Sequence, residues 1–133
     1  MAVSGMNHFT ILTADLEATL AFYREHLDLA PGPRPPFTFP GAWLYADGGK
    51  GKEAILHVIA GAGVAAERLV PGVIDHMAFT GQGLAAAVAK LKERGLPYDL
   101  RRLPEYGTWQ LFFHDPNGAR VEIDFDPAEA APA

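Results

Sequence analysis

The sequence lacks cysteine, clustered basic residues and long apolar runs. With no cysteine in 133 residues, the chain can form neither a disulfide nor a zinc–thiolate centre, so any bound metal must have nitrogen and oxygen ligands. The net charge of −5 and the scattered Lys and Arg residues argue against the basic face that nucleic-acid binding requires. No apolar run approaches the roughly 20 residues that cross a bilayer, and no signal peptide is recognisable. We therefore expect a soluble cytoplasmic protein without a nucleic-acid or membrane partner.

Size and composition favour one domain. A chain of 133 residues with 49% apolar side chains can bury roughly two thirds of its unfolded surface around a single core. Within this domain, 1–133, we expect two repeated modules, a Gly/Ala-rich connector that can serve as a hinge, and a Pro/Ala-rich tail that frays. Their approximate bounds are 6–60 for the first module, 61–72 for the connector, 73–125 for the second module and 126–133 for the tail.

The main feature present is an internal repeat. A shift of 68 residues, from position 8 to position 76, places His76 on His8 and keeps apolar residues in register through the following segment. The clearest further matches are Leu84 on Leu16, Val88 on Leu20, Leu91 on Tyr23 and Glu93 on Glu25. A self-match at a fixed offset indicates one supersecondary unit used twice, with each copy burying its apolar face.

Local patterns give both copies the same order of elements. Asp15 is a suitable N-cap for a first helix that ends near Leu29, and Gly95 ends a second helix. Alternating apolar residues and turn signals predict the strands, and Asp115-Pro116-Asn117-Gly118 is a strong hairpin turn. We predict an α+β fold of two β-α-β-β-β modules, with strands at 6–13, 37–39, 42–46 and 53–59, and then at 73–80, 97–102, 107–114 and 119–125.

Four potential metal ligands occupy matching places in the repeat. His8 and His76 lie in the first strand of each copy, and His57 and Glu122 lie in the last strand, if the second copy carries a three-residue deletion. A single histidine or glutamate in a strand is more often structural or solvated than a ligand. Solvated side chains, however, have no reason to respect an internal symmetry. Three imidazoles and a carboxylate suit a divalent first-row metal, so we predict a site for Fe, Mn, Ni or Zn.

The chain resembles the vicinal oxygen chelate superfamily, which includes glyoxalase I, extradiol dioxygenases, fosfomycin-resistance enzymes and bleomycin-binding proteins. The resemblance extends from Met6 to Phe125 and is strongest around His8, His76 and the segment 111–122. It implies paired modules that form a half-barrel cup around a metal, and a small-molecule substrate. It also implies that His8, His76 and Glu122 are the usual ligands, and that His57 is either a fourth ligand or a neighbouring acid–base group.

Several reactions stay open. The superfamily shares a Lewis-acid metal that binds two neighbouring substrate oxygens and stabilises an enolate-like or oxyanion intermediate. A glyoxalase-type isomerase or lyase requires a mobile carboxylate, a role open to Glu122, whereas an extradiol dioxygenase can use His57 as a general acid. In dioxygenases a tyrosine stands where this chain has Phe112, and Tyr106 is a possible substitute. The alternatives are a fosfomycin-type thiol transferase, with Arg101, Arg102 and Arg120 as candidate cations, and a metal-free protein of the bleomycin-resistance type.

The catalytic candidates are therefore Glu122 and His57, and the substrate-binding candidates are Tyr106, Gln110, Phe112 and Arg120. Trp43, Trp109 and Phe37 are further candidates for the wall of the pocket. Because related cups are often completed by two chains, we also expect a homodimer. Its sites can lie within one chain or combine His8 and His57 of one chain with His76 and Glu122 of the other.

Overall fold

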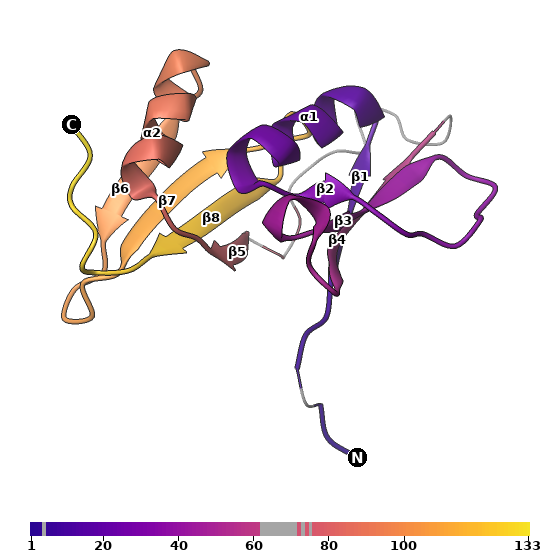
Figure 1. Cartoon of the computed structure of the whole chain (residues 1–133), viewed down its shortest axis with the longest axis horizontal. Coiled ribbons are helices and arrows are strands. Elements are labelled where there is room, and N and C mark those ends of the chain that lie inside the picture. Colours follow the sequence, from indigo (N-terminus) through magenta and orange to yellow (C-terminus); the bar gives the residue numbers. More distant parts are fainter. Residues whose placement is uncertain (4, 62–71, 73, 75) are drawn as a thin grey trace. The chain divides into compact units, whose positions relative to one another are not determined.

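The computed structural model describes residues 1–3, 5–61, 72, 74 and 76–133, and the chain divides into two compact units, Met1–Val70 and Pro71–Ala133 (Figure 1). The division falls inside the segment expected to connect the two modules. Residues 62–71 of the expected connector lie outside the described residues. In the part of the chain that is described, no helix is long and apolar enough to cross a membrane.

The first unit contains one mixed four-stranded sheet. Its strands lie in the order β1-β4-β3-β2, with β1 parallel to β4 and the other neighbours antiparallel. Along the chain its elements are β1 (Phe9–Thr13), α1 (Leu16–Leu27), β2 (Ala30–Pro31), β3 (Gly41–Tyr45), the short 3-10 helix η1 (Asp47–Gly49) and β4 (Ala54–Ala60).

The second unit repeats this topology. Its sheet has the order β5-β8-β7-β6. The edge strand β5 is parallel to β8, and the other neighbours are antiparallel. Its elements are β5 (Met77–Thr80), α2 (Leu84–Glu93), β6 (Tyr98–Arg102), β7 (Trp109–His114) and β8 (Arg120–Phe125). The predicted α+β class with two β-α-β-β-β modules is confirmed.

Strand register shows which residues are equivalent in the two sheets. His57 pairs with Thr10 on β1 and with Trp43 on β3. Glu122 pairs with Ala78 on β5 and with Phe112 on β7. Since Ala78 is the repeat equivalent of Thr10, His57 and Glu122 occupy the same position in their sheets. The ring that lies next to each of them, Trp43 or Phe112, is equivalent as well.

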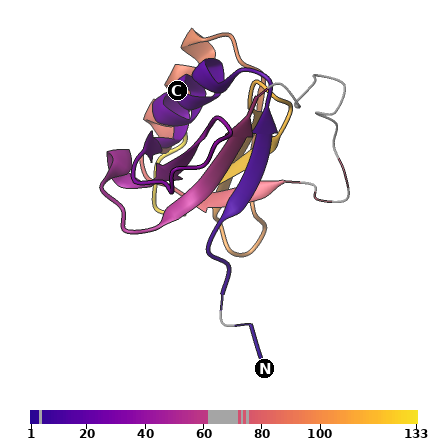
Figure 2. The same cartoon turned by 90° about the vertical axis from the view of Figure 1, so that its right-hand side faces the viewer.

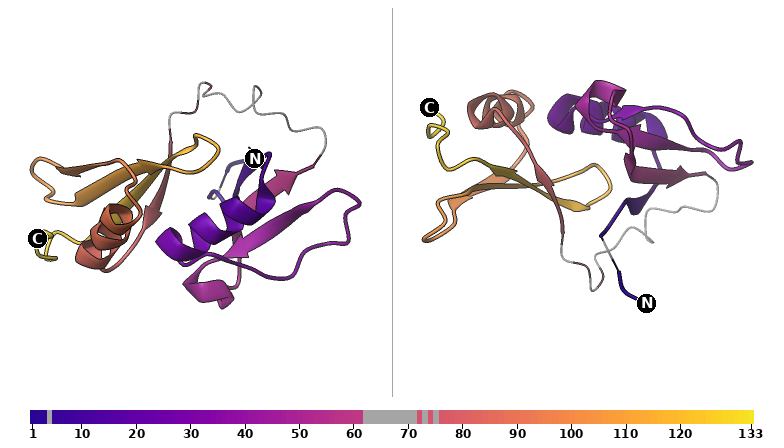
Figure 3. Two further views of the ribbon diagram at one scale, coloured as in Figure 1. Left: turned by 90° about the horizontal axis from the view of Figure 1, so that it is seen from above. Right: turned by 60° about the horizontal axis from the view of Figure 1, so that its bottom comes forward.

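Each helix covers one face of the sheet of its own unit (Figures 2 and 3). The side chains on that face are buried because every second residue of a strand points the same way. In the first unit they include Tyr23 from the helix and Leu44, Leu56 and Val58 from the sheet. In the second they include Leu84, Val88 and Leu91 from the helix and Leu111, Phe113, Val121 and Phe125 from the sheet. We call the opposite face of each sheet its open face.

The first helix is capped as the sequence predicts. The Oδ1 atom of Asp15 accepts a hydrogen bond from Ala18 N at 3.0 Å, which satisfies one of the free amides of the first turn. The buried hydroxyls of Thr13 and Thr19 lie 2.9 Å apart and both donate to Asp15 O. The junction between β1 and α1 is therefore held by local side chains.

The prediction of a strand at 37–39 was wrong. The second strand of the first sheet is Ala30–Pro31, and residues 37–39 belong to the loop before β3. In that loop the rings of Phe37 and Phe39 stack on each other at 4.8 Å, with the Arg34 guanidinium over both. The alternation of aromatic residues with Thr38 therefore reflects stacking in a loop rather than pairing in a sheet.

The C-terminal tail does not fray as predicted. The Glu129 carboxylate accepts hydrogen bonds from Gly83 N at 3.2 Å and Leu84 N at 2.7 Å, at the start of α2. The Glu129 carbonyl accepts a further bond from Trp109 Nε1. Helix α2 has no capping side chain at Gly83, so the tail supplies the cap from 46 residues away.

Candidate metal and substrate site

Two predicted ligands meet on the open face of the first sheet. The His57 ring lies between two other rings, with the His8 centroid at 3.8 Å and the Trp43 centroid at 4.1 Å. Both neighbours are nearly parallel to it, with interplanar angles of 10° and 11°. Because β1 and β3 flank β4 on opposite sides, the two rings cover opposite faces of His57. Its ring orientation is therefore fixed by packing.

The stack limits how His8 and His57 can share a metal. An imidazole binds a metal through a lone pair in the plane of its ring. The two ring planes are almost parallel, with centroids 3.8 Å apart, so the planes do not meet near the rings. One ring must turn before both nitrogens can point to one cation. His57 is held within β4, whereas His8 precedes β1 and is exposed. His8 is therefore the ring that has to move.

The environment of His57 favours its neutral form. Burial lowers the pKa of His57 below its ordinary value, and the nearby His8 imidazole lowers the pKa further, against a smaller opposite effect of a hydrogen bond with the Ala54 backbone. At neutral pH the ring consequently has a nitrogen lone pair available. A neutral imidazole of this kind can bind a metal or accept a proton.

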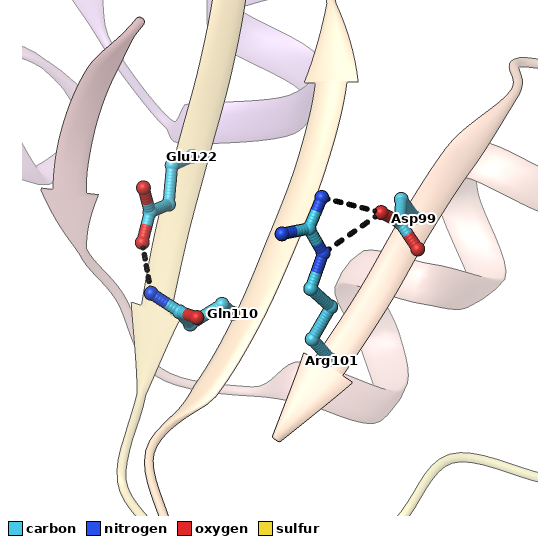
Figure 4. A network of polar contacts seen from close by, with 4 residues as sticks. All are labelled: Asp99, Arg101, Gln110 and Glu122. Carbon is cyan, nitrogen blue, oxygen red and sulfur yellow. Dashed lines mark hydrogen bonds and ion pairs between the residues drawn. The ribbon is translucent and has the colours of Figure 1, made fainter. Parts of the chain in front are cut away.

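The other two predicted ligands meet on the open face of the second sheet. The Nε2 atom of His76 lies 2.7 Å from Glu122 Oε2. The Gln110 side chain donates from Nε2 to the other oxygen, Oε1, at 2.7 Å (Figure 4). Glu122 is only 4% exposed, so its carboxylate is held on both oxygens in a buried position.

Asp124 adds a second carboxyl group beside Glu122, on the same face of β8. Burial raises the pKa of Asp124 from 3.8 to about 6, and the neighbouring Glu122 carboxyl contributes to the rise. Its buried Oδ1 atom has no hydrogen-bond partner among the described residues. An unpartnered oxygen beside another carboxylate is a place that favours a proton or a cation.

The donor set agrees with the predicted metal in its chemistry. Within either unit, the described residues include no group of three or more His, Asp or Glu side chains arranged to hold an ion. The four predicted ligands are instead two pairs, His8 with His57 and His76 with Glu122. Neighbouring ligand atoms on a first-row metal lie about 3 Å apart, close to the 2.7 Å that separates His76 Nε2 from Glu122 Oε2. The nitrogen and oxygen atoms of this second pair therefore have a spacing suitable for binding one cation.

The residues predicted to contact substrate lie in different places in the second unit. Gln110 and Phe112 lie on the open face of β7, and the Arg120 guanidinium lies 4.3 Å from the Phe112 centroid. Tyr106 is 76% exposed in the loop between β6 and β7, and its role stays a prediction. Trp109 lies on the α2 side of the sheet, where it contacts the tail, so the suggestion that it walls the pocket was wrong.

Comparison with known proteins identifies the family of the chain. A model of the Glyoxalase/Bleomycin resistance protein/Dioxygenase superfamily matches residues 5–123. The chain belongs to this superfamily. A curated relative, Glyoxylase I 4 of Arabidopsis thaliana, is 29% identical over 128 residues, which cover 91% of this chain and 70% of the relative.

Solved structures share the superfamily fold. The fosfomycin resistance protein FosX of Listeria monocytogenes has a TM-score of 0.70 at 17% identity, covering 93% of this chain and 94% of the other. A variant of FosX has been solved with Mn(II) and 1S,2S-dihydroxypropylphosphonic acid; it has a TM-score of 0.69 at 16% identity and covers 94% of each chain. Lactoylglutathione lyase of Agrobacterium tumefaciens has a TM-score of 0.61 at 17% identity, covering 98% of this chain and all of the other. Superfamily members thus include enzymes and bind divalent metals and small molecules.

Sequence reasoning missed two charged residues on the face that carries the candidate ligands. Asp124 and Arg101 both lie on the open face of the second sheet, but Asp124 received no role and Arg101 was considered only with a thiol transferase. The alternation of side chains along β8 was a usable signal for Asp124, because it places residues 120, 122 and 124 on one face. Arg101 carried no such signal, because its place beside Phe112 depends on strand pairing.

Proposed function

We propose that the chain is a metal-dependent enzyme of the glyoxalase type, which converts a small substrate that binds a divalent cation through two neighbouring oxygens. His8, His57, His76 and Glu122 would hold the cation. The observation that carries this proposal is the equivalence of His57 and Glu122 in the two sheets, each beside a histidine that directly precedes the neighbouring strand.

When bound, the metal would supply Lewis acidity, which stabilises negative charge on the substrate oxygens. The protein would contribute orientation and proton transfer. Gln110 holds Oε1 of Glu122, so Oε2, once separated from His76 Nε2, would take a proton from a substrate carbon and return it. In the alternative where His57 lies beside the metal instead of binding it, its neutral ring, packed against Trp43, would accept a proton.

This chemistry favours an isomerase or lyase over oxygen insertion. Proton transfer at a carbon next to a carbonyl requires only a base and charge stabilisation, both of which the proposed residues supply. The 29% identical relative is named as a glyoxylase. Phe112 has no hydroxyl group and is surrounded by Arg101 and Arg120, which disfavours the tyrosine-dependent dioxygenase. A metal-free binding protein of the bleomycin-resistance type is the non-catalytic alternative.

Metal reconstitution tests the proposal. Metal-free protein is loaded anaerobically with Fe(II), Mn(II), Ni(II) or Zn(II) and assayed with a glutathione hemithioacetal and with a catechol panel plus O₂. We expect isomerase turnover that chelator abolishes and metal restores. Ring cleavage with iron or manganese would select the dioxygenase instead. A protein that binds no metal and whose thermal stability is unchanged by chelator would contradict both enzymatic functions.

We further propose a homodimer with two metal sites. Mixing tests whether each site uses residues of both chains: the variants His57→Ala and Glu122→Ala are unfolded together and refolded as a mixture. If sites are shared, each mixed dimer regains one complete four-ligand site, and one of its two metals binds with the wild-type affinity. If each site lies within one chain, mixing restores nothing. A monomer at micromolar concentration would refute the dimer.

A further inference from the structure

The C-terminal tail is bound at several points to the α2 side of the second unit. Figure 1 shows the tail running from the end of β8 and then beside α2. Glu129 accepts from the first amides of α2, and Lys92 Nζ, near the other end of the helix, donates to Ala133 O at 2.9 Å. Closer to the sheet, Arg102 Nη2 donates to Pro127 O at 2.7 Å. The tail is therefore an ordered element that contacts both the helix and the sheet.

Trp109 is the residue of β7 that the tail holds. Its indole Nε1 donates to Glu129 O at 3.0 Å, and the Arg102 guanidinium lies over the ring, 4.5 Å from the centroid. Trp109 pairs with Arg102 on β6 and with Phe125 on β8, and these are the last paired residues at this end of the sheet. The ends of strands open more easily than their centres. The tail therefore holds closed the row of the sheet that would open first.

Gln110 follows Trp109 on β7 and lies in the adjoining row, where it pairs with Arg101 and Asp124. Because successive side chains of a strand point to opposite faces, Trp109 contacts the tail while Gln110 reaches Glu122 on the open face. The Gln110 Nε2 atom lies 2.7 Å from Glu122 Oε1, and such a hydrogen bond weakens when its length or angle changes. Opening of the last row would therefore disturb the group that holds the carboxylate.

We propose that the tail positions Gln110 on Glu122, and that it does so through Glu129 and Trp109. These two are positioning residues of the candidate site, although neither lies on the face that carries it. The contact between the tail and β7 keeps the last row of the sheet closed, and the closed row fixes the place of the Gln110 amide. The effect on metal affinity rests on the proposed function, whereas the effect on the hydrogen bond between Gln110 and Glu122 requires no metal.

NMR of the full-length, metal-free protein tests the coupling. Glu129→Ala and Trp109→Phe each remove a contact of the tail without changing a residue of the open face. We expect the side-chain amide signals of Gln110 to move toward those of the exposed Gln82, because the hydrogen bond to Glu122 is formed for a smaller fraction of the time. The backbone amide of Gln110 should also exchange with solvent roughly tenfold faster, since loss of a hydrogen bond of ordinary strength makes the last row easier to open.

Val88→Ala is the matched control for a general loss of stability. Val88 is buried in α2, so the variant weakens the packing of the same helix on the same sheet and keeps every hydrogen bond of the tail. It should leave the side-chain signals of Gln110 at their wild-type positions. Glu129→Gln is the conservative variant, which retains an acceptor oxygen for α2 and should restore much of the wild-type Gln110 signal. A purely structural role of the tail would not produce this difference.

Zinc affinity gives a second readout. Glu129→Ala should weaken Zn(II) binding, but by less than the roughly 10-fold loss expected for Gln110→Ala. The double variant should bind zinc as Gln110→Ala alone does, because the tail acts on the site only through Gln110. A double variant that binds zinc more weakly than Gln110→Ala would overturn the proposal, since the tail would then act by another route.

Unchanged Gln110 signals in both Glu129→Ala and Trp109→Phe would also overturn the proposal, as would an equal change of these signals in Val88→Ala. A protein that shows the expected Gln110 changes but binds no metal would refute the proposed enzyme and leave the positioning role in place. Metal-dependent turnover, together with Gln110 signals that do not respond to loss of the tail contacts, would do the reverse.

Discussion

The two open faces share a backbone plan and differ in chemistry. On the first sheet, His57 is stacked between His8 and Trp43, and the face is dominated by rings. On the second, the equivalent Glu122 is held by His76 and Gln110 and lies beside Asp124. The repeat therefore preserves the positions of donor atoms but not their charge. One half offers neutral nitrogen, and the other offers the negative oxygen that balances a divalent cation.

The two junctions between the first strand and the helix differ in the same way. In the first unit Thr13, Asp15 and Thr19 hold the turn with local hydrogen bonds. Their repeat equivalents, Gly81, Gly83 and Ala87, have no side-chain groups for this purpose. Glu129 from the tail takes over the cap of α2. A repeated backbone can thus be stabilised by near residues in one copy and distant residues in the other.

The largest expected effect is at the two equivalent ligand positions. Glu122→Ala should lower the affinity for Zn(II) by more than about 100-fold, because losing even an outer partner of a ligand costs roughly 10–100-fold. His57→Ala should lower it less, since two imidazoles and the only proposed carboxylate ligand remain. Competition with a chromophoric chelator measures both affinities. Equal, small losses in the two variants would contradict the assigned difference between the halves.

The next effect concerns the residue that holds Glu122. Gln110→Ala removes the hydrogen bond to Oε1 and should weaken metal binding by about 10-fold or more. Gln82→Ala is the control, because Gln82 is an exposed glutamine of the same unit outside the site. The same chelator competition applies. If the two variants bind metal alike, Gln110 does not position the carboxylate.

The helix caps allow a direct comparison of near and distant stabilisation. Asp15→Ala and Glu129→Ala should each lower the free energy of unfolding by about 1 kcal/mol, the usual value of an N-cap. Urea denaturation measures the change, with the exposed Glu93→Ala as a control expected to be near neutral. Only Glu129→Ala should also change the emission of Trp109. Without the Glu129 carboxylate the tail is released from α2, and the hydrogen bond from the Trp109 indole to the backbone carbonyl of residue 129 is lost with it. An unaltered unfolding free energy in Glu129→Ala would mean that the tail does not cap α2 in solution.

The smallest effect is a dependence on pH in the metal-free protein. The pKa of Asp124 is raised in the folded state from 3.8 to about 6, so folding favours the protonated group and its contribution to stability falls as pH rises between these values. Asp124→Asn should remove this fall. The variant should gain stability over the wild type above pH 6 and lose that advantage below pH 4, as measured by thermal unfolding across this range. Parallel pH profiles would show that the pKa is not raised.

Local sequence patterns predicted most elements of the fold, but not those that form through contacts with residues far along the chain. The repeat, the Asp15 cap and the Asp115–Gly118 turn follow from residue types within a few positions, and they appear as predicted. Ala30–Pro31 forms β2 only because it pairs with β3, so no pattern within those two residues marks it. The tail looked unstructured because its composition carries no sign that Glu129 meets α2.

The same distinction between local pattern and distant contact applies to the candidate site. Symmetry of the repeat located His8, His57, His76 and Glu122, because matching positions in a duplicated unit can be read from one chain. The stacking of His57 and the two arginines around Phe112 depend on neighbours across the sheet. Strand order and register were needed to find them.

X-ray absorption of the zinc-loaded protein tests the four proposed ligands most directly. We expect one Zn(II) per chain with only nitrogen and oxygen neighbours at roughly 2.0–2.2 Å, and outer-shell scattering from three imidazoles. His57→Ala and His8→Ala should each reduce the imidazole count to two. Zinc that shows one imidazole or none, or that is not retained at one per chain, would contradict the central proposal that both modules contribute to a single metal site.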